Sequence, residues 1–184
     1  NNLNTARGQL GGAGTQTAAL AFAGQADPGV TAATESWNGT NWTNVNSMNQ
    51  LRRAIEGCGT NTAALGFGGY NPGLVALTES WNGTNWTEVN DLNRAIRGCG
   101  AGGTQTSAVV FGGYAPSEPG PSTFTEVWNG TTWSIDGNMS QNRSDIAGFG
   151  TSTSAVAAGG NIAPVTAVTE EFTKPGFLTK TLTS

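Results

Sequence analysis

Four glutamates recur along the chain at nearly constant spacing and are its first candidates for chemistry. They are Glu35, Glu79, Glu126 and Glu170, separated by 44, 47 and 44 residues. Two carboxylates can hydrolyse a glycosidic bond when one acts as acid and the other as base or nucleophile. A residue that returns once per repeat is more typical of structure, so we expect these carboxylates to accept hydrogen bonds or a salt bridge. The candidate cations precede them: Arg7, Arg52, Arg94 and Arg143.

The composition lacks the other usual catalytic sets. The chain has no histidine, which excludes a Ser-His-Asp triad and most zinc sites. Its two cysteines, Cys58 and Cys99, each lie in the phrase GCG. We expect two small buried thiols, with a disulfide between them as an open alternative. The sequence predicts no catalytic residue, no metal site and no cofactor, and a protein that is not an enzyme.

Six tryptophans belong to the same repeated phrase as the glutamates. "TESWNGTNWTNVN" spans residues 34–46 and "TESWNGTNWTEVN" spans 78–90. Two aromatic positions recur five residues apart: Trp37 and Trp42, Trp81 and Trp86, Trp128 and Trp133, Phe172 and Phe177. Because a core accepts Phe for Trp more readily than a ligand platform does, we expect these pairs to pack between repeats. Sugar stacking on exposed indoles is the alternative.

The repeat length of about 45 residues predicts a four-stranded unit stacked around an axis. Gly, Asn and Thr are too frequent for helices. In the second repeat the expected strands are 52–60, 62–69, 74–81 and 84–89. Asn82-Gly83 predicts a two-residue hairpin that places Trp81 opposite Thr84 and Glu79 opposite Trp86.

The third repeat is longer than the others by three residues. Its stretch "NRAIRGCGAGGTQT" (93–106) aligns with "RRAIEGCGTNT" (52–62) in the second repeat. This alignment places the additional residues after GCG, in a longer turn.

The 184 residues are expected to form one all-β domain, 1–184, with repeats at approximately 1–45, 46–89, 90–136 and 137–184. The formal net charge is −4 and only 11% of residues are charged, so no basic patch for nucleic acid is expected. No apolar run approaches the ~20 residues of a membrane span. Neither a secretory signal nor an initiator Met opens the chain, so we expect it to be processed or cut from a longer one.

The pattern resembles the kelch repeat, a β-propeller unit. That family carries a Gly-Gly doublet after the second strand, an aromatic residue on the third strand and Trp on the fourth. Here the second repeat has Gly68-Gly69, Trp81 and Trp86, and the third has Gly112-Gly113, Trp128 and Trp133. The resemblance covers essentially the whole chain and implies a small propeller of four kelch-like, four-stranded blades.

The sequence departs from the kelch pattern in three ways. The first aromatic of each pair is Trp where kelch units more often have Tyr, and the two aromatics are five residues apart where kelch units have a slightly longer spacing. Four repeats are also fewer than the usual six or seven blades. Three outcomes stay open: a closed four-bladed ring, a half-ring that two chains complete, or part of a larger propeller. We expect the first and last blades to meet by face packing without strand exchange.

Phrases such as "WNGTNWTEVNDLN" and "FGGYAP" are similar to those of Gly/Asn/Thr-rich kelch-like proteins of tailed bacteriophages. This resemblance implies a non-enzymatic structural module, a tail- or fibre-associated virion component. The alternative is a secreted, lectin-like, glycan-binding propeller. The protein or glycan partner is left open, as is homo-oligomer formation, and the expected location is the virion or the extracellular space.

The loops after each second strand vary most between repeats, and recognition tends to be placed on such loops. The candidate ligand-binding residues on this loop face are Asp27, Tyr70, Asn71 and Tyr114. Tolerance of sequence change explains the same variation equally well.

Overall fold

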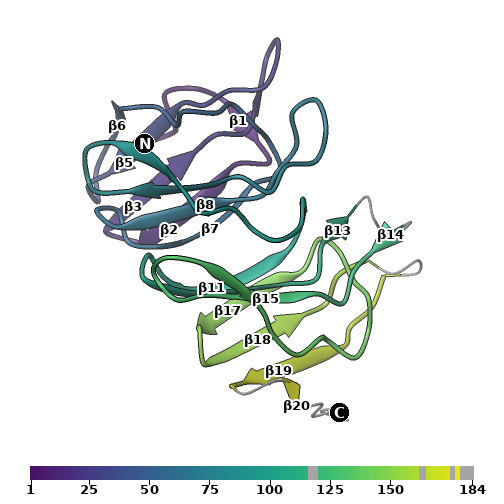
Figure 1. The fold of residues 1–184 in the computed structure, drawn as a ribbon. Helices are drawn as coiled ribbons and strands as arrows, with labels where there is room; N and C mark the ends of the chain where they lie inside the picture. The colour runs from purple at the N-terminus through teal and green to yellow at the C-terminus, as the bar shows by residue number, and fades with distance from the viewer. Residues whose placement is uncertain (116–119, 162–164, 175–176, 179–184) are drawn as a thin grey trace.

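The computed structural model describes residues 1–115, 120–161, 165–174 and 177–178 and is all-β over these residues (Figure 1). Four antiparallel sheets of four strands form the blades of a β-propeller, as the repeat pattern predicts. Blade 1 contains β2 (Gly11–Thr15), β3 (Ala18–Phe22), β5 (Thr34–Trp37) and β6 (Trp42–Val45). Blade 2 contains β7 (Glu56–Gly59), β8 (Ala64–Phe67), β9 (Thr78–Trp81) and β10 (Trp86–Val89).

Blades 3 and 4 repeat this order of strands. Blade 3 contains β11 (Gly100–Thr104), β12 (Ser107–Phe111), β15 (Thr125–Trp128) and β16 (Trp133–Ile135). Blade 4 contains β17 (Ala147–Thr151), β18 (Ser154–Ala158), β19 (Thr169–Thr173) and β20 (Phe177–Leu178). Two short ladders stand outside the blades, β1 (Arg7–Gly8) with β4 (Gln25–Ala26) and β13 (Tyr114–Ala115) with β14 (Gly120–Pro121).

The first strand of each blade is the inner one, and its glycines allow close approach between blades. Inner strands lie side by side in sequence order, β2 with β7, β7 with β11, and β11 with β17. A Cβ atom on Gly148 would lie 2.2 Å from the backbone N of Ala101, and one on Gly57 would lie 2.4 Å from a ring carbon of Phe22. A larger residue at either position would push the neighbouring blades apart.

The predicted two-residue hairpin at Asn82-Gly83 is wrong. Trp81 pairs directly with Trp86, and the connection between them is four residues long, 82–85. The Asn82 side chain explains the length, because its Oδ1 accepts the backbone N–H groups of Thr84 and Asn85 at 2.9 and 2.8 Å. Only Gly83 of the two central residues has a positive φ, whereas the predicted turn needs both.

The additional residues of the third repeat do not lie in a turn after GCG. Asn49 and Asn93 each donate a backbone N–H to the repeated glutamate of their blade, at 2.7 and 2.9 Å. The next equivalent bridges end at Tyr70 and Tyr114. Both pairs are 44 residues apart, so the backbone registers without a gap up to Tyr114. The three additional residues therefore follow it, in the connection between β12 and β15.

This register also separates the two cysteines, which share a phrase but not a position. Cys58 lies in the inner strand β7, whereas Cys99 precedes β11 and holds the place of Ile55. Both thiols are buried and free, so the disulfide that the sequence left open does not form.

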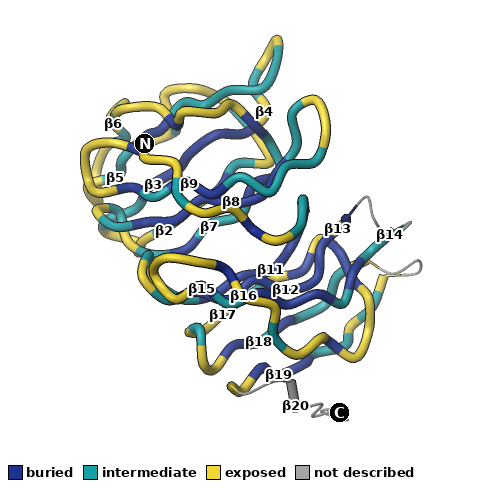
Figure 2. The backbone as a smooth tube through the Cα atoms, in the orientation of Figure 1, coloured by how far each residue is buried: buried dark blue, intermediate teal, exposed yellow. Residues whose placement is uncertain are grey.

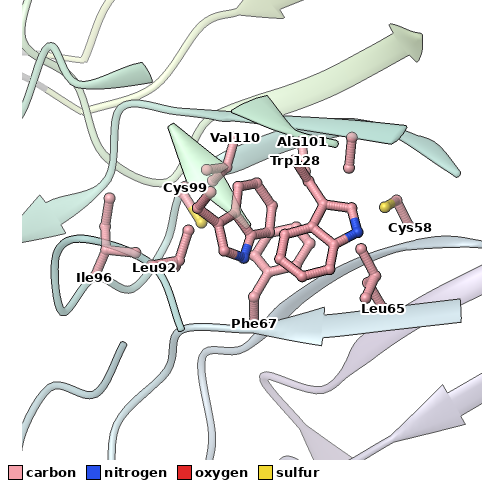
Figure 3. Close-up of a cluster of buried hydrophobic side chains, with 11 residues drawn as sticks. Cys58, Leu65, Phe67, Leu92, Ile96, Cys99, Ala101, Val110 and Trp128 are labelled. Carbon is pink, nitrogen blue, oxygen red and sulfur yellow. The ribbon is translucent and has the colours of Figure 1, made fainter. Parts of the chain in front are cut away.

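The junctions of blades 1 and 2 and of blades 2 and 3 each bury a tryptophan pair against the preceding blade. Dark blue in Figure 2 marks the buried residues along the backbone. Figure 3 shows the junction of blades 2 and 3, where Trp128 packs beside Phe67, Leu65 and Cys58. The ring centroids of Phe67 and Trp133 are 5.1 Å apart in an edge-on contact. The same contact at the preceding junction joins Phe22 and Trp86 at 4.9 Å.

Within the described residues the first and last blades do not meet, contrary to the expected face packing. The inner strands β17 and β2 are both fully described, and they make no contact comparable to that of successive inner strands. The sheets instead follow one another across the molecule, from blade 1 to blade 4 (Figure 1). Strand exchange is absent as expected, since the described strands of blade 4 all come from residues 147–178. In the part of the chain that the structure describes, blade 1 and blade 4 thus each have one face that no other blade covers.

Candidate binding surfaces and buried polar sites

The loop face carries two stacked arginine–tyrosine pairs, one on blade 2 and one on blade 3. Arg53 lies over the Tyr70 ring with its Cζ 4.9 Å from the centroid, and Arg97 lies over Tyr114 at 5.1 Å. Each pair also exchanges two backbone hydrogen bonds, at 3.2 and 2.8 Å. Tyr114 is 37% exposed. The arrangement offers a planar cation and a phenol side by side, which suits polar or aromatic ligands.

The other two predicted loop residues lie on neighbouring positions without joining these pairs. Asn71 is half-buried, and its Nδ2 donates to the backbone oxygen of Leu51 at 2.9 Å. Asp27 is exposed on the corresponding connection of blade 1. No hydrogen bond or ring contact among the described residues joins Asp27, Tyr70 and Tyr114. The four candidates share one connection of three successive blades and do not form one closed pocket.

The repeated glutamates are buried and anchor the chain that enters each blade. Glu79 Oε1 accepts from Arg52 Nη1 at 2.6 Å, and its Oε2 accepts the backbone N–H and the side chain of Asn49 at 2.7 and 3.0 Å. Arg7–Glu35 and Arg143–Glu170 repeat the ion pair, at 2.8 and 2.7 Å.

Burial lowers the pKa of Arg52, and the Glu79 carboxylate opposes that shift. An arginine keeps its charge even so. These carboxylates are therefore already occupied by the protein itself.

The third blade departs from this pattern because of the register. The position three residues after Asn93, which Arg52 and Arg143 hold in their blades, is Ile96. Arg94 instead places its guanidinium over the ring of Phe124, 2.9 Å from the centroid. The prediction that Arg94 is the counterpart of the other three arginines is therefore wrong.

The tryptophans divide into a buried set and a half-exposed pair. Trp81, Trp86, Trp128 and Trp133 are 1–6% exposed, whereas Trp37 and Trp42 of blade 1 are only half-buried. Five indole N–H groups have acceptors: Trp37, Trp81 and Trp128 donate to backbone oxygens, and Trp86 and Trp133 to threonine hydroxyls. Trp42 Nε1 has no acceptor among the described residues.

Glu56 is a feature that sequence reasoning missed. It is the one carboxyl on an inner strand of the described residues, beside Cys58 and close to Cys99. Burial raises its pKa to about 7, although the N–H of Gly57 donates to it at 3.1 Å and opposes the shift. Burial, with the nearby Glu56 charge, raises the pKa of Cys58 to about 12 and that of Cys99 well above its ordinary value. Both thiols stay protonated and unreactive at neutral pH.

Two shallow grooves were also not predicted. One, of about 410 Å³, is lined by Glu88, Val89, Asn90, Trp128, Gly130 and Thr131 at the outer seam of blades 2 and 3. Within it Asn90 Nδ2 donates to the Thr131 backbone oxygen at 2.9 Å. The second has the same volume and lies along Trp86 to Glu88 beside Asn49. The polar residues of these seams repeat with the blades, which was the only available signal.

No protein-family model matches this chain, and no curated protein is significantly similar to it. The described residues contain no group of three or more His, Cys, Asp or Glu side chains arranged to hold a metal ion. Among the same residues there is no helix with the length and apolar character needed to cross a membrane.

Proposed function

We propose that this chain is a non-enzymatic structural or interaction module with blades of the kelch type, and that it serves as a tail- or fibre-associated component of a bacteriophage particle. The non-enzymatic part of this proposal is supported by the hydrogen bonds and ion pairs that the repeated glutamates make. Glu35, Glu79 and Glu170 are each consumed by an ion pair inside their own blade. A carboxylate held by arginine and backbone N–H groups is a poor acid or base for a substrate.

The kelch assignment and the phage assignment rest on resemblance. The Gly-Gly doublets and the Trp positions supply the first, and the Asn/Gly/Thr-rich phrases supply the second. A repeated scaffold with few charged side chains and variable loops fits a particle component that contacts other proteins.

Mass spectrometry of purified virions from the source of this sequence tests the phage proposal. Peptides of this chain should co-purify with tail or fibre proteins through a density gradient, at a fixed ratio to them. Recovery of the chain only from the soluble fraction, outside the particles, would contradict a virion role.

A second candidate is a secreted glycan-binding module, and the stacked pairs Arg53–Tyr70 and Arg97–Tyr114 favour it. Aromatic faces beside hydrogen-bond donors suit sugar rings. A glycan array probed with the wild-type chain, Tyr70→Ala and Tyr114→Ala separates the two proposals, with Ile135→Ala as a control on a distant outer strand. Binding that both tyrosine variants lose and the control keeps would support the lectin, and an empty array would contradict it.

A further inference from the structure

Blade 1 and blade 4 each have one face that no other described blade covers, and these two faces carry the two halves of one interface. Inside the chain this interface occurs three times, between blades 1 and 2, 2 and 3, and 3 and 4. The leading face of each following blade supplies a pair of aromatic residues with small and aliphatic side chains around it. The trailing face of the preceding blade supplies an aliphatic residue, a Phe and a Thr.

The leading face of blade 1 has the residues of this interface, and no described strand of another blade packs on it. Its members are Leu3, Leu10, Ala19, Trp37 and Trp42, and all five are half-buried. The residues at the same positions in blade 2 are Met48, Ile55, Ala64, Trp81 and Trp86, and all five are buried, at 0–5% exposed. The apolar character is therefore kept at the end of the arc, where water would favour polar side chains.

No described strand of another blade packs on the trailing face of blade 4 either. Its members are Phe149, Val156, Ala158 and Thr169 by strand register. Phe149 is 61% exposed, and the other three are half-buried. Their counterparts on the middle strands are completely buried, for example Leu65 and Phe67 in blade 2.

Blade 4 rearranges the apolar volume of this face without removing it. Ala158 replaces the Phe of the other blades, and Phe149 on the adjacent inner strand stands where they have Ala13, Cys58 and Gly102. The aromatic ring has moved to the neighbouring strand of the same face. An incoming blade would thus find a differently shaped surface of similar apolar content.

The hydrogen-bonding groups at the two ends match as well. At two internal junctions the second Trp of a blade donates its Nε1–H to a Thr of the preceding blade, Trp86 to Thr34 at 3.0 Å and Trp133 to Thr78 at 3.1 Å. At the open ends, Trp42 Nε1 has no acceptor among the described residues. Thr169 holds the place of the accepting threonine on blade 4.

We propose that a second copy of this chain covers both open faces, so that two chains join head to tail in one ring of eight blades. Blade 1 of each copy packs its Trp37–Trp42 face on Phe149, Val156 and Ala158 of the other. Trp42 Nε1 then donates to the Thr169 hydroxyl across the junction.

A contact between two different faces closes into a ring only for a definite number of copies. Two copies give eight blades, the upper end of the usual range of about 4–8, whereas three copies would exceed it. The proposal does not depend on whether the protein belongs to a phage or binds glycans.

Light scattering behind a sizing column, at chain concentrations from about 1 to 100 μM, tests the proposal. The wild type should have twice the chain mass of 18.7 kDa. Phe149→Arg on the trailing face and Ala19→Arg on the leading face should each run at the mass of a single chain. Ile135→Arg, on a residue that is 59% exposed on the outer strand β16, is the matched control and should keep the wild-type mass.

Mixing the two end variants tests the head-to-tail arrangement. The Phe149→Arg chain keeps a normal blade 1 and the Ala19→Arg chain keeps a normal blade 4, so an equimolar mixture can form one intact junction and should regain twice the chain mass. Far-UV circular dichroism checks that each variant is folded; Val156→Arg replaces Phe149→Arg, and Leu10→Arg replaces Ala19→Arg, if either is not. A wild type at single-chain mass, a mass that grows without limit with concentration, or a Phe149→Arg chain that stays paired would each overturn the proposal.

Discussion

Thr125 offers a direct test of the interface chemistry, because its hydroxyl lacks the indole N–H donor that its counterparts in blades 1 and 2 have. Thr34 and Thr78 occupy the same register position in their blades and accept the indole N–H groups of Trp86 and Trp133. The corresponding aromatic residue of blade 4 is Phe177, which has no N–H to donate. Thr125 is completely buried, and its Oγ1 has no hydrogen-bond partner among the residues that the structure describes. Replacing it with Val removes an unpaired hydroxyl and keeps the shape of the side chain.

The expected gain is about 1–2 kcal/mol, the desolvation cost of an unpaired buried hydroxyl. The matched control is Thr78→Val, which changes the same side chain where its hydroxyl is in use. That variant leaves the indole N–H of Trp133 buried without an acceptor and should lose about 1–3 kcal/mol.

Urea unfolding followed by tryptophan fluorescence, at one fixed chain concentration, measures both changes. The midpoint of Thr125→Val should rise and that of Thr78→Val should fall, with the dependence on urea unchanged. Equal destabilisation of the two variants would refute the reasoning, because it would mean that the Thr125 hydroxyl makes a stabilising contact.

Three further predictions concern buried charge and close packing. Burial raises the pKa of Glu56 to about 7 in the folded protein, against about 4.3 in the unfolded chain. The folded state therefore loses stability as the pH rises between these two values, because the buried carboxyl loses its proton. In unfolding titrations across pH, the free energy of unfolding of Glu56→Gln should exceed that of the wild type by up to roughly 3 kcal/mol at pH 8 and by nothing near pH 4. Arg52→Met should cost roughly 3–5 kcal/mol by leaving the Glu79 carboxylate buried without its cation, and the double variant with Glu79→Gln should cost less than the single losses combined. Gly148→Ala should cost about 1–3 kcal/mol, because its Cβ would lie 2.2 Å from a backbone nitrogen of β11, whereas Gly29→Ala, which meets nothing within 4 Å, should be neutral by thermal unfolding.

Much of the fold could be predicted because the residues that recur in each repeat are the ones that pack in the core. The spacing of Trp81 and Trp86 around a polar turn identifies two paired strands, and the apolar run before them identifies a buried one. The pairing of those strands could not be read from Asn82-Gly83 alone. A hairpin motif competes with local side-chain bonds, and here the Asn82 carboxamide satisfied two backbone N–H groups and set a longer turn.

The alignment of the third repeat failed for a different reason. Arg53-Ala54-Ile55 has the same residue types as the stretch before Cys99, but the two stretches do not occupy the same structural positions. The backbone bridges of Tyr70 and Tyr114 decide which residues are equivalent, and they shift the phrase by three. A single sequence shows which side chains match between repeats, but it does not show which backbone groups pair by hydrogen bonds.

The open ends and the buried carboxyl at Glu56 were also beyond the sequence. Whether four blades close depends on the angle between successive sheets, which the close approach of many glycines sets collectively. The repeat pattern was enough to predict that the candidate loop residues share one face. The stacking of Arg53 and Arg97 on the tyrosines could not be predicted, because it depends on which backbone residues pair with Tyr70 and Tyr114.

Hydrogen exchange of the six indole N–H groups, resolved by NMR, tests whether each repeated Trp pair is an interface element. Trp42 should exchange slowly in the wild type, as Trp86 and Trp133 do, and Trp42 alone should exchange fast in Phe149→Arg. Fast exchange of Trp86 and Trp133, or a Trp42 that exchanges equally fast in both proteins, would contradict this interface role.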